Sequence, residues 1–166
     1  MRLITGILHP DAGTVRFRGL ETEKMSDSLR AEAFAYLMQI DERGEESVSQ
    51  LISQIAAEKE GEVWKLLRRL AFKEENREKE VKWLSGGELK KIYIALTFVQ
   101  DAALLILDEP SLHLDQEALA VLIDLLESDP RAEILITHDP ALQSVCQRHY
   151  QIKTGEVNVL EEVFHG

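Results

Sequence analysis

The fold class of this chain is best indicated by the segment Ala103-Leu104-Leu105-Ile106-Leu107-Asp108-Glu109-Pro110. Its apolar residues follow one another without alternation, which is typical of a strand buried on both faces of a parallel sheet. Two carboxylates and a proline end the strand, at the place where open α/β sheets bind their ligands. The stretch therefore predicts a buried parallel strand that presents Asp108 and Glu109 at its carboxyl end.

Those two carboxylates suit different chemistry. Asp108 carries the oxygen ligands that Mg²⁺ prefers, usually with water between. Glu109 comes one residue later, so its side chain points elsewhere and could polarise a water molecule as a general base. An ordinary turn at the end of a strand is the alternative, because Asp, Glu and Pro are common there.

The neighbouring patterns extend this sheet. We expect a helix running into a short strand over Leu29–Leu37, helices over Glu88–Val99 and Gln116–Leu126, and a second buried strand over Glu133–Thr137. This order favours an α/β fold in which helices cover the faces of a parallel sheet. The other expected elements are a helix end at Arg2–Leu8, a strand at Thr14–Arg18, two helices within Val48–Phe72 that Gly61 separates, a short helix at Pro140–Gln147, and strands at Tyr150–Lys153 and Val157–Leu160.

The length of 166 residues fits a single domain. Its core is expected over residues 1–40 and 84–166. Helical residues of about 41–83 interrupt the alternation of strands and helices, so they are expected to form a small inserted subdomain.

Composition narrows the classes of function. Lys and Arg number 19 against 30 Asp and Glu, which gives a formal net charge of −11. Direct nucleic-acid binding through bulk charge is therefore not expected, since phosphates would be repelled. The single cysteine fits a reducing compartment, and no apolar run approaches the roughly 18–20 residues of a membrane helix. A cytoplasmic protein is expected.

Leu84-Ser85-Gly86-Gly87-Glu88 has the features of a phosphate-recognition element. Two glycines at the start of a helix expose backbone N–H groups, and the helix dipole favours an anion there. Ser85 could cap the helix and also donate its hydroxyl to an anion. A plain capped Ser-Gly-Gly turn is the alternative.

Two further polar residues come after expected strands. His138 ends the strand at Glu133–Thr137 and is expected at the same sheet edge as Asp108 and Glu109, where it could donate a hydrogen bond to a phosphate oxygen. Gln39 comes after Ala35-Tyr36-Leu37-Met38 and could ligate a metal or orient water. Taken alone, each residue is more often an incidental polar position than a site residue.

In this order and spacing, the motifs resemble those of an ATP-binding cassette (ABC) ATPase, over nearly the whole chain. The resemblance implies an α/β P-loop NTPase (RecA-like) core with an inserted helical subdomain. The matching positions are Gln39 for the Q-loop, Leu84–Glu88 for the signature, Ala103–Glu109 for Walker B with its catalytic glutamate, Ser111–Asp115 for the D-loop and His138 for the switch histidine.

The resemblance also implies a mechanism. Two cassettes sandwich two ATP molecules head to tail, with Mg²⁺, so the implied partner is a second ABC ATPase domain. The implied roles are Mg²⁺ binding for Asp108 and Gln39, water activation for Glu109, γ-phosphate contact for His138, nucleotide contact across the dimer for Ser85, Gly86, Gly87 and Glu88, and a link between the two sites for Asp115.

The chain departs from the family in one major respect. G-x-x-x-x-G-K-[ST], the Walker A phosphate loop, does not occur in the 166 residues. Met1–Gly6 resembles the segment directly after that loop in the family, so an N-terminally truncated cassette is expected, with in-frame upstream DNA encoding the loop. The chain alone is then expected to be inactive. Leu96 also stands where the family usually has arginine, which is expected to weaken packing there.

Three functions fit this pattern. The first is the ATP-binding subunit of an ABC transporter, which couples ATP hydrolysis to transport by a separate membrane permease at the inner face of the membrane. The second is a piece of a soluble, translation-factor-type ABC ATPase with the ribosome as partner, which the His113-Leu114-Asp115 ending slightly favours. The third is a non-catalytic chain that donates its signature to a partner or is inert.

Overall fold

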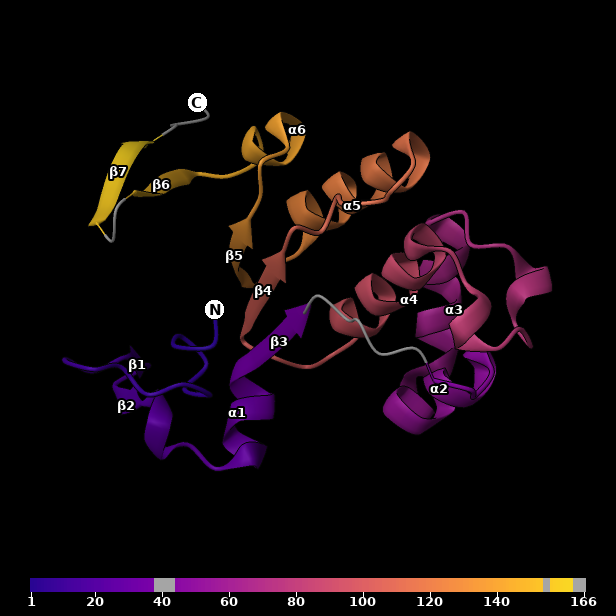
Figure 1. The fold of residues 1–166 in the computed structure, drawn as a ribbon, viewed down its shortest axis with the longest axis horizontal. Coiled ribbons are helices and arrows are strands. Elements are labelled where there is room, and N and C mark those ends of the chain that lie inside the picture. The colour runs from indigo at the N-terminus through magenta and orange to yellow at the C-terminus, as the bar shows by residue number, and fades with distance from the viewer. Residues whose placement is uncertain (38–43, 154–155, 163–166) are drawn as a thin grey trace.

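The computed structural model describes residues 1–37, 44–153 and 156–162 (Figure 1). Its main sheet is parallel and contains β3 (Phe34–Leu37), β4 (Leu104–Asp108) and β5 (Ala132–Ile136), in the order β3-β4-β5. The apolar run at 103–107 therefore forms the central strand, and the predicted α/β class with a parallel sheet is confirmed.

Two hydrophobic clusters cover the two faces of β4. Leu105 and Leu107 belong to a large cluster, whereas Leu104 and Ile106 belong to a smaller one. The larger cluster is built with the helices α4 (Gly86–Phe98), α5 (Gln116–Ser128) and α6 (Pro140–Gln143); the smaller includes the end of α1 (Asp27–Ala33) and residues near the N-terminus. This alternation explains why the strand needs no polar face.

The helical segment packs on the same core. Helices α2 (Val48–Ala56) and α3 (Glu60–Arg69) lie beside α4 (Figure 1), and their buried residues join the larger cluster. Leu96, where weaker packing was expected, is buried within that cluster. The proposed boundary of a subdomain at about 41–83 stays a prediction.

The break between α2 and α3 differs from the prediction. Gly61 is the second residue of α3, and the break is a 3-10 helix at Ala57–Lys59. Lys59 explains its position, because its Nζ donates to the Val99 carbonyl at 2.7 Å and lies 2.6 Å from an Asp101 carboxylate oxygen. Tertiary contacts, which local sequence does not reveal, place this break.

The N-terminal residues do not form the expected helix. Residues 2–8 form successive turns, and Gly6 has a φ of +71°, which is incompatible with a continuing right-handed helix. The strand expected at Thr14–Arg18 shortens to β1 (Arg16–Phe17), which pairs with β2 (Leu20–Glu21) in an antiparallel hairpin. Positive φ values at both turn residues, 49° and 84°, suit such a tight turn.

Strand β5 is less buried than predicted. We expected a strand covered on both faces, but no residue of β5 is fully buried and its two end residues are exposed. Within the described residues β5 pairs only with β4, so it is an edge strand of the sheet. Its Glu133 holds a side-chain oxygen that is buried without a hydrogen-bond partner.

The C-terminal strands form a ribbon with one apolar face. Strands β6 (Arg148–Lys153) and β7 (Glu156–Glu162) pair antiparallel, with Tyr150 opposite Val159 and Ile152 opposite Val157. All four of these side chains are more than half exposed. Among the described residues, no helix has the length and apolarity needed to cross a bilayer.

The apolar face of this ribbon should drive self-association, because exposed apolar patches and two-stranded ribbons favour contacts between copies. Replacing Ile152→Lys together with Val157→Glu places an ion pair on that face without changing net charge. We expect concentration-dependent light scattering to fall. The matched control, Gln151→Lys with Asn158→Glu, alters the opposite, polar face and should leave scattering unchanged; equal effects of both pairs would contradict the prediction.

Glu133 should make stability depend on pH. Burial, helped by the Asp129 carboxylate and opposed by Arg131, raises the pKa of Glu133 from 4.5 to about 7. Between these values the folded state holds a proton that the unfolded state has lost, so stability is full at low pH and falls as pH rises towards 7. Because Glu133 is only partly buried, we expect Glu133→Gln to stabilise by about 1–2 kcal/mol at pH 8 relative to pH 5.

Urea unfolding at the two pH values measures this difference. Glu127→Gln, which removes the same charge from an exposed position on α5, is the control. Parallel pH profiles for wild type and Glu133→Gln would refute the assignment.

Candidate functional site

The carboxyl ends of β4 and β5 bring together three of the predicted site residues. Asp108 ends β4 opposite Ile136, the last residue of β5. Glu109 comes next, and its N–H donates to the Ile136 carbonyl at 2.9 Å. Its carboxylate lies 3.5 Å from Nε2 of His138, as expected for residues at one sheet edge. The Glu109 side chain is 21% exposed and that of His138 is 95% exposed, so the pair opens to solvent.

This pair is suited to moving a proton at a solvent-facing edge. Asp108 adds an oxygen ligand of the kind that Mg²⁺ takes. No group of three or more His, Cys, Asp or Glu side chains that could hold a metal occurs in the described parts of the chain. The donor set therefore fits a Mg²⁺ ion that takes one or two ligands from the protein and the rest from phosphates and water. Gln39, the other predicted ligand, lies outside the described residues.

The predicted phosphate-recognition element begins helix α4. Ser85 caps the helix: its Oγ accepts from the Glu88 N–H at 3.2 Å, and the Glu88 carboxylate accepts from the Ser85 N–H at 2.7 Å. Because Oγ acts as an acceptor in the cap, the hydroxyl hydrogen stays available to an anion. Ser85 is exposed, as a contact with a partner requires.

Glu88 is engaged within its own chain. Its carboxylate also accepts from Asn76 Nδ2 at 2.6 Å and lies 4.0 Å from Lys79 Nζ. Burial alone would raise the pKa of Glu88, but the Ser85 hydrogen bonds, with Lys79 and Asn76, outweigh burial and lower it. Glu88 therefore fastens the 76–79 segment to the start of α4.

Glycine is required at position 87 for a reason that the motif does not reveal, whereas a Cβ at position 86 would make an ordinary contact. A Cβ on Gly87 would lie 2.5 Å from the His113 carbonyl oxygen, and one on Gly86 would lie 3.4 Å from the His113 ring. The loop after β4 therefore runs directly against the first turn of α4. Any side chain at position 87 would push the two apart.

Asp115 is held at both carboxylate oxygens. One oxygen accepts from the Ala118 N–H at 2.8 Å, which caps α5, and the other accepts from Lys91 Nζ at 2.7 Å. The Lys91 hydrogen bond is the main reason that the pKa of Asp115 lies below its ordinary value. The preceding residue, Lys90, donates to the Glu109 carbonyl at 3.2 Å. Burial lowers the pKa of Lys90, and the two carboxylates at the end of β4 partly oppose that shift.

Sequence reasoning missed Lys90 and Lys91, and it placed His113 in the D-loop match without foreseeing its contact with Gly86 and Gly87. One signal could have found Lys91, since it lies between Leu89 and Ile92 in a helix that is apolar on nearly every side. A charge among such residues needs a partner. For Lys90 and His113 no comparable signal exists, because their contacts depend on how the loop after β4 crosses α4.

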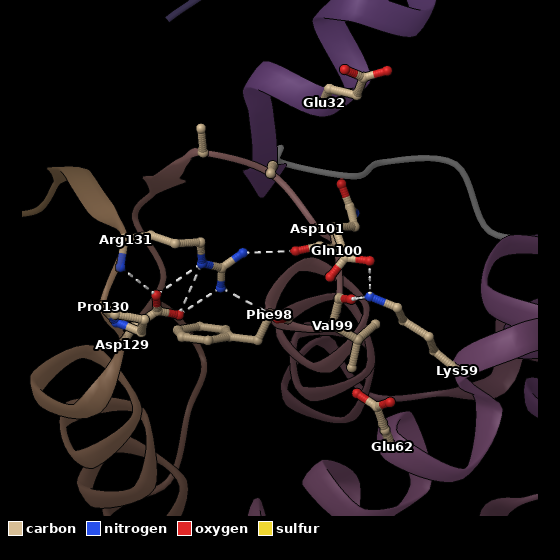
Figure 2. A pocket seen from close by; sticks show the side chains of 12 residues that line it. Glu32, Lys59, Glu62, Phe98, Val99, Gln100, Asp101, Asp129, Pro130 and Arg131 are labelled. Carbon is tan, nitrogen blue, oxygen red and sulfur yellow. Dashed lines mark hydrogen bonds and ion pairs between the residues drawn. The ribbon is translucent and has the colours of Figure 1, made fainter.

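A hollow of about 640 Å³ lies elsewhere, lined by residues that precede β4 and β5 (Figure 2). Four of its charged side chains form two ion pairs, Arg131 with Asp129 and Lys59 with Asp101. The Arg131 guanidinium lies between the Asp129 carboxylate and the carbonyls of Phe98 and Gln100, and Lys59 reaches Asp101. None of the predicted site residues lines it. This polar network joins the end of α4 to its neighbours, and the candidate site remains at the carboxyl edge.

Known proteins resemble this chain in sequence and in fold. A sequence model described as ABC transporter matches residues 1–112. An uncharacterized ABC transporter ATP-binding protein YfmR from Bacillus subtilis is 44% identical over 80 residues, which cover 48% of this chain and 13% of that protein. The macrolide export ATP-binding/permease protein MacB from Hahella chejuensis is 28% identical over 173 residues, covering 95% of this chain and 26% of MacB.

The fold is that of an ABC cassette. The dimeric structure of the ATP-binding cassette MJ0796 bound to ADP and Pi superposes with a TM-score of 0.81, at 17% identity, over 98% of this chain and 79% of that one. The expected P-loop NTPase class is thereby confirmed. The aligned part of the chain covers 13% of the length of YfmR and 26% of the length of MacB, well under two thirds of either protein. The match over 1–112 shows that this chain belongs to the ABC transporter family.

Proposed function

We propose that this chain is the ATP-binding part of an ABC transporter, which works in a head-to-tail dimer with a second ABC ATPase domain. The observation that carries the proposal is the contact between Glu109 and His138 at the carboxyl edge of the sheet. The loop after β4, which begins with Glu109, also lies against the Ser85–Gly87 start of α4. These are the residues that the resemblance assigns to hydrolysis and to nucleotide contact across the dimer.

Each residue then has a role. Glu109 accepts a proton from the attacking water, and His138 donates a hydrogen bond to the terminal phosphate. Asp108 and Gln39 hold Mg²⁺, which supplies neutralisation of phosphate charge when bound. Ser85, Gly86 and Gly87 contact the nucleotide held by the partner, while Glu88 keeps their helix start in shape through the cap and Asn76. Asp115 lies on the loop that links the two sites.

A membrane permease is the proposed second partner. A hollow of about 620 Å³ runs between α1 and the residues at the end of α2 and in the 3-10 helix after it, with Ile55 half exposed at its wall. An apolar side chain beside such a hollow suits a docked segment of a membrane subunit. We place the chain in the cytoplasm at the inner face of the membrane. The relative MacB is named as a macrolide export ATP-binding/permease protein.

The chain is proposed to be inactive by itself. Transfer of a phosphoryl group depends on electrostatic positioning of the phosphates, and the phosphate loop is the principal cradle for it. That loop does not occur within these 166 residues.

Purified chain should therefore show no Mg²⁺-dependent phosphate release above a no-protein blank. Glu109→Gln should be indistinguishable from wild type, because no competent site exists to be disabled. Phosphate release is measured with and without excess EDTA. Steady release that requires Mg²⁺ and disappears in Glu109→Gln would overturn the proposal.

The signature should act in trans. The chain is mixed with a cassette that has an intact phosphate loop but a disabled signature, so that turnover depends on the signature of this chain. Ser85→Asp keeps a good helix cap and places a carboxylate against the phosphate. We expect turnover to fall at least about tenfold, since one lost phosphate contact costs on the order of 1.4 kcal/mol or more.

Ser47→Asp is the matched control, because Ser47 caps α2 with the same capping-box geometry. It should leave turnover unchanged. Gly87→Asp is a poorer probe, since any Cβ there meets the His113 carbonyl within the same chain. If Ser85→Asp and Ser47→Asp behave alike, the trans role is wrong.

A further inference from the structure

The loop that carries Glu109 has an unfavourable backbone. Glu109 has a φ of +44° and His113 a φ of +69°, in the left-handed region that residues with a Cβ avoid. Such a backbone conformation is unfavourable and persists only where its surroundings hold it. Something must therefore fix the loop over residues 109–115.

Two consecutive lysines of α4 provide that restraint. Lys90 Nζ donates to the Glu109 carbonyl at 3.2 Å, beside the Leu112 N–H, which donates to the same oxygen at 3.3 Å. Lys91 Nζ lies 2.7 Å from the Asp115 carboxylate, and Lys91 is only 6% exposed. Lys90 thus binds Glu109, the first residue of the loop, and Lys91 binds Asp115, the last.

A different loop position would be costly for Lys91. A buried ammonium without its carboxylate is strongly unfavourable, so Lys91 ties Asp115 to α4. Between these two contacts, the His113 carbonyl lies against Gly87, so the loop contacts α4 at its beginning, middle and end. The same helix begins with Ser85 and Gly86, which face the partner in the proposed dimer.

We propose that Lys90 and Lys91 are positioning residues that lock the Glu109 loop to the signature helix. This inference rests on the proposed function for its catalytic meaning: in a head-to-tail dimer the signature serves one site and Glu109 the other. The two lysines then make a rigid link between the sites within one chain. Neither lysine touches nucleotide; each acts through Glu109 or Asp115.

The first test uses amide hydrogen exchange of the whole chain. Lys90→Met and Lys91→Met remove the charge and keep the apolar stem, so the fold should survive. The Leu112 and Leu114 amides, which bond within the loop, should exchange at least about tenfold faster, the scale of one lost charged hydrogen bond. The Ile106 amide in β4 should keep its protection. Lys90→Arg and Lys91→Arg should restore slow exchange, and Lys65→Met, at an exposed position of α3, should change nothing.

The second test uses the mixture of this chain with the signature-disabled cassette. The one working site of this mixture combines the phosphate loop of the cassette with the signature of this chain, so Lys91 acts there through Asp115 and the signature helix and not through Glu109. Lys91→Met should lower kcat about fivefold or more and leave KM for ATP unchanged, with Lys91→Arg restoring kcat. Unchanged loop exchange in the Met variants, or failure of the Arg variants to restore it, would overturn the inference. An inactive assembly with wild-type chain would instead refute the proposed function, and the exchange result would still decide the role of the lysines.

Discussion

Strand β4 is hydrogen-bonded on both edges and covered on both faces, and the other parts of the site are placed relative to it. Its alternate side chains enter two separate hydrophobic clusters. A strand in this position has no tolerance for a polar residue until it leaves the sheet. The first carboxylate therefore appears at Asp108, at the carboxyl end of the sheet, and Glu109 comes next in the turn that ends β4.

Helix α4 converts that strand end into a site. Its first turn is capped by Ser85 and Glu88, its second carries the lysines that hold the loop after β4, and its apolar faces fill the larger cluster. Beyond its last turn, the carbonyls of Val99 and Gln100 bind Lys59 and Arg131. Helices α2 and α3, the sheet and the signature are thus joined through α4. A movement of the first turn of α4 would therefore shift Glu109 through the Lys90 contact.

Several features could be predicted because they depend on local chemistry. The unbroken apolar run of β4, the capped start of α4 and the helix at Gln116–Ser128 each satisfy a local rule of burial, capping or periodicity. Where prediction failed, distant contacts decided. The break falls at Ala57–Lys59, where Lys59 contacts the Val99 carbonyl, and β5 is only partly buried, at the edge of the described sheet. Residues 2–8 form turns, since Gly6 packs against the Thr22 carbonyl with a positive φ.

Local sequence patterns predict the α/β order, the carboxylates at the end of β4 and the glycine-rich start of α4, because each depends on neighbours within a few residues. Tertiary structure alone decided that His138 stands 3.5 Å from Glu109, that Gly87 must lack a side chain because of His113, and that Lys90 and Lys91 hold the loop. The physical reason is that these contacts join segments up to tens of residues apart. Their distances are set by strand register and helix packing, which no local pattern encodes.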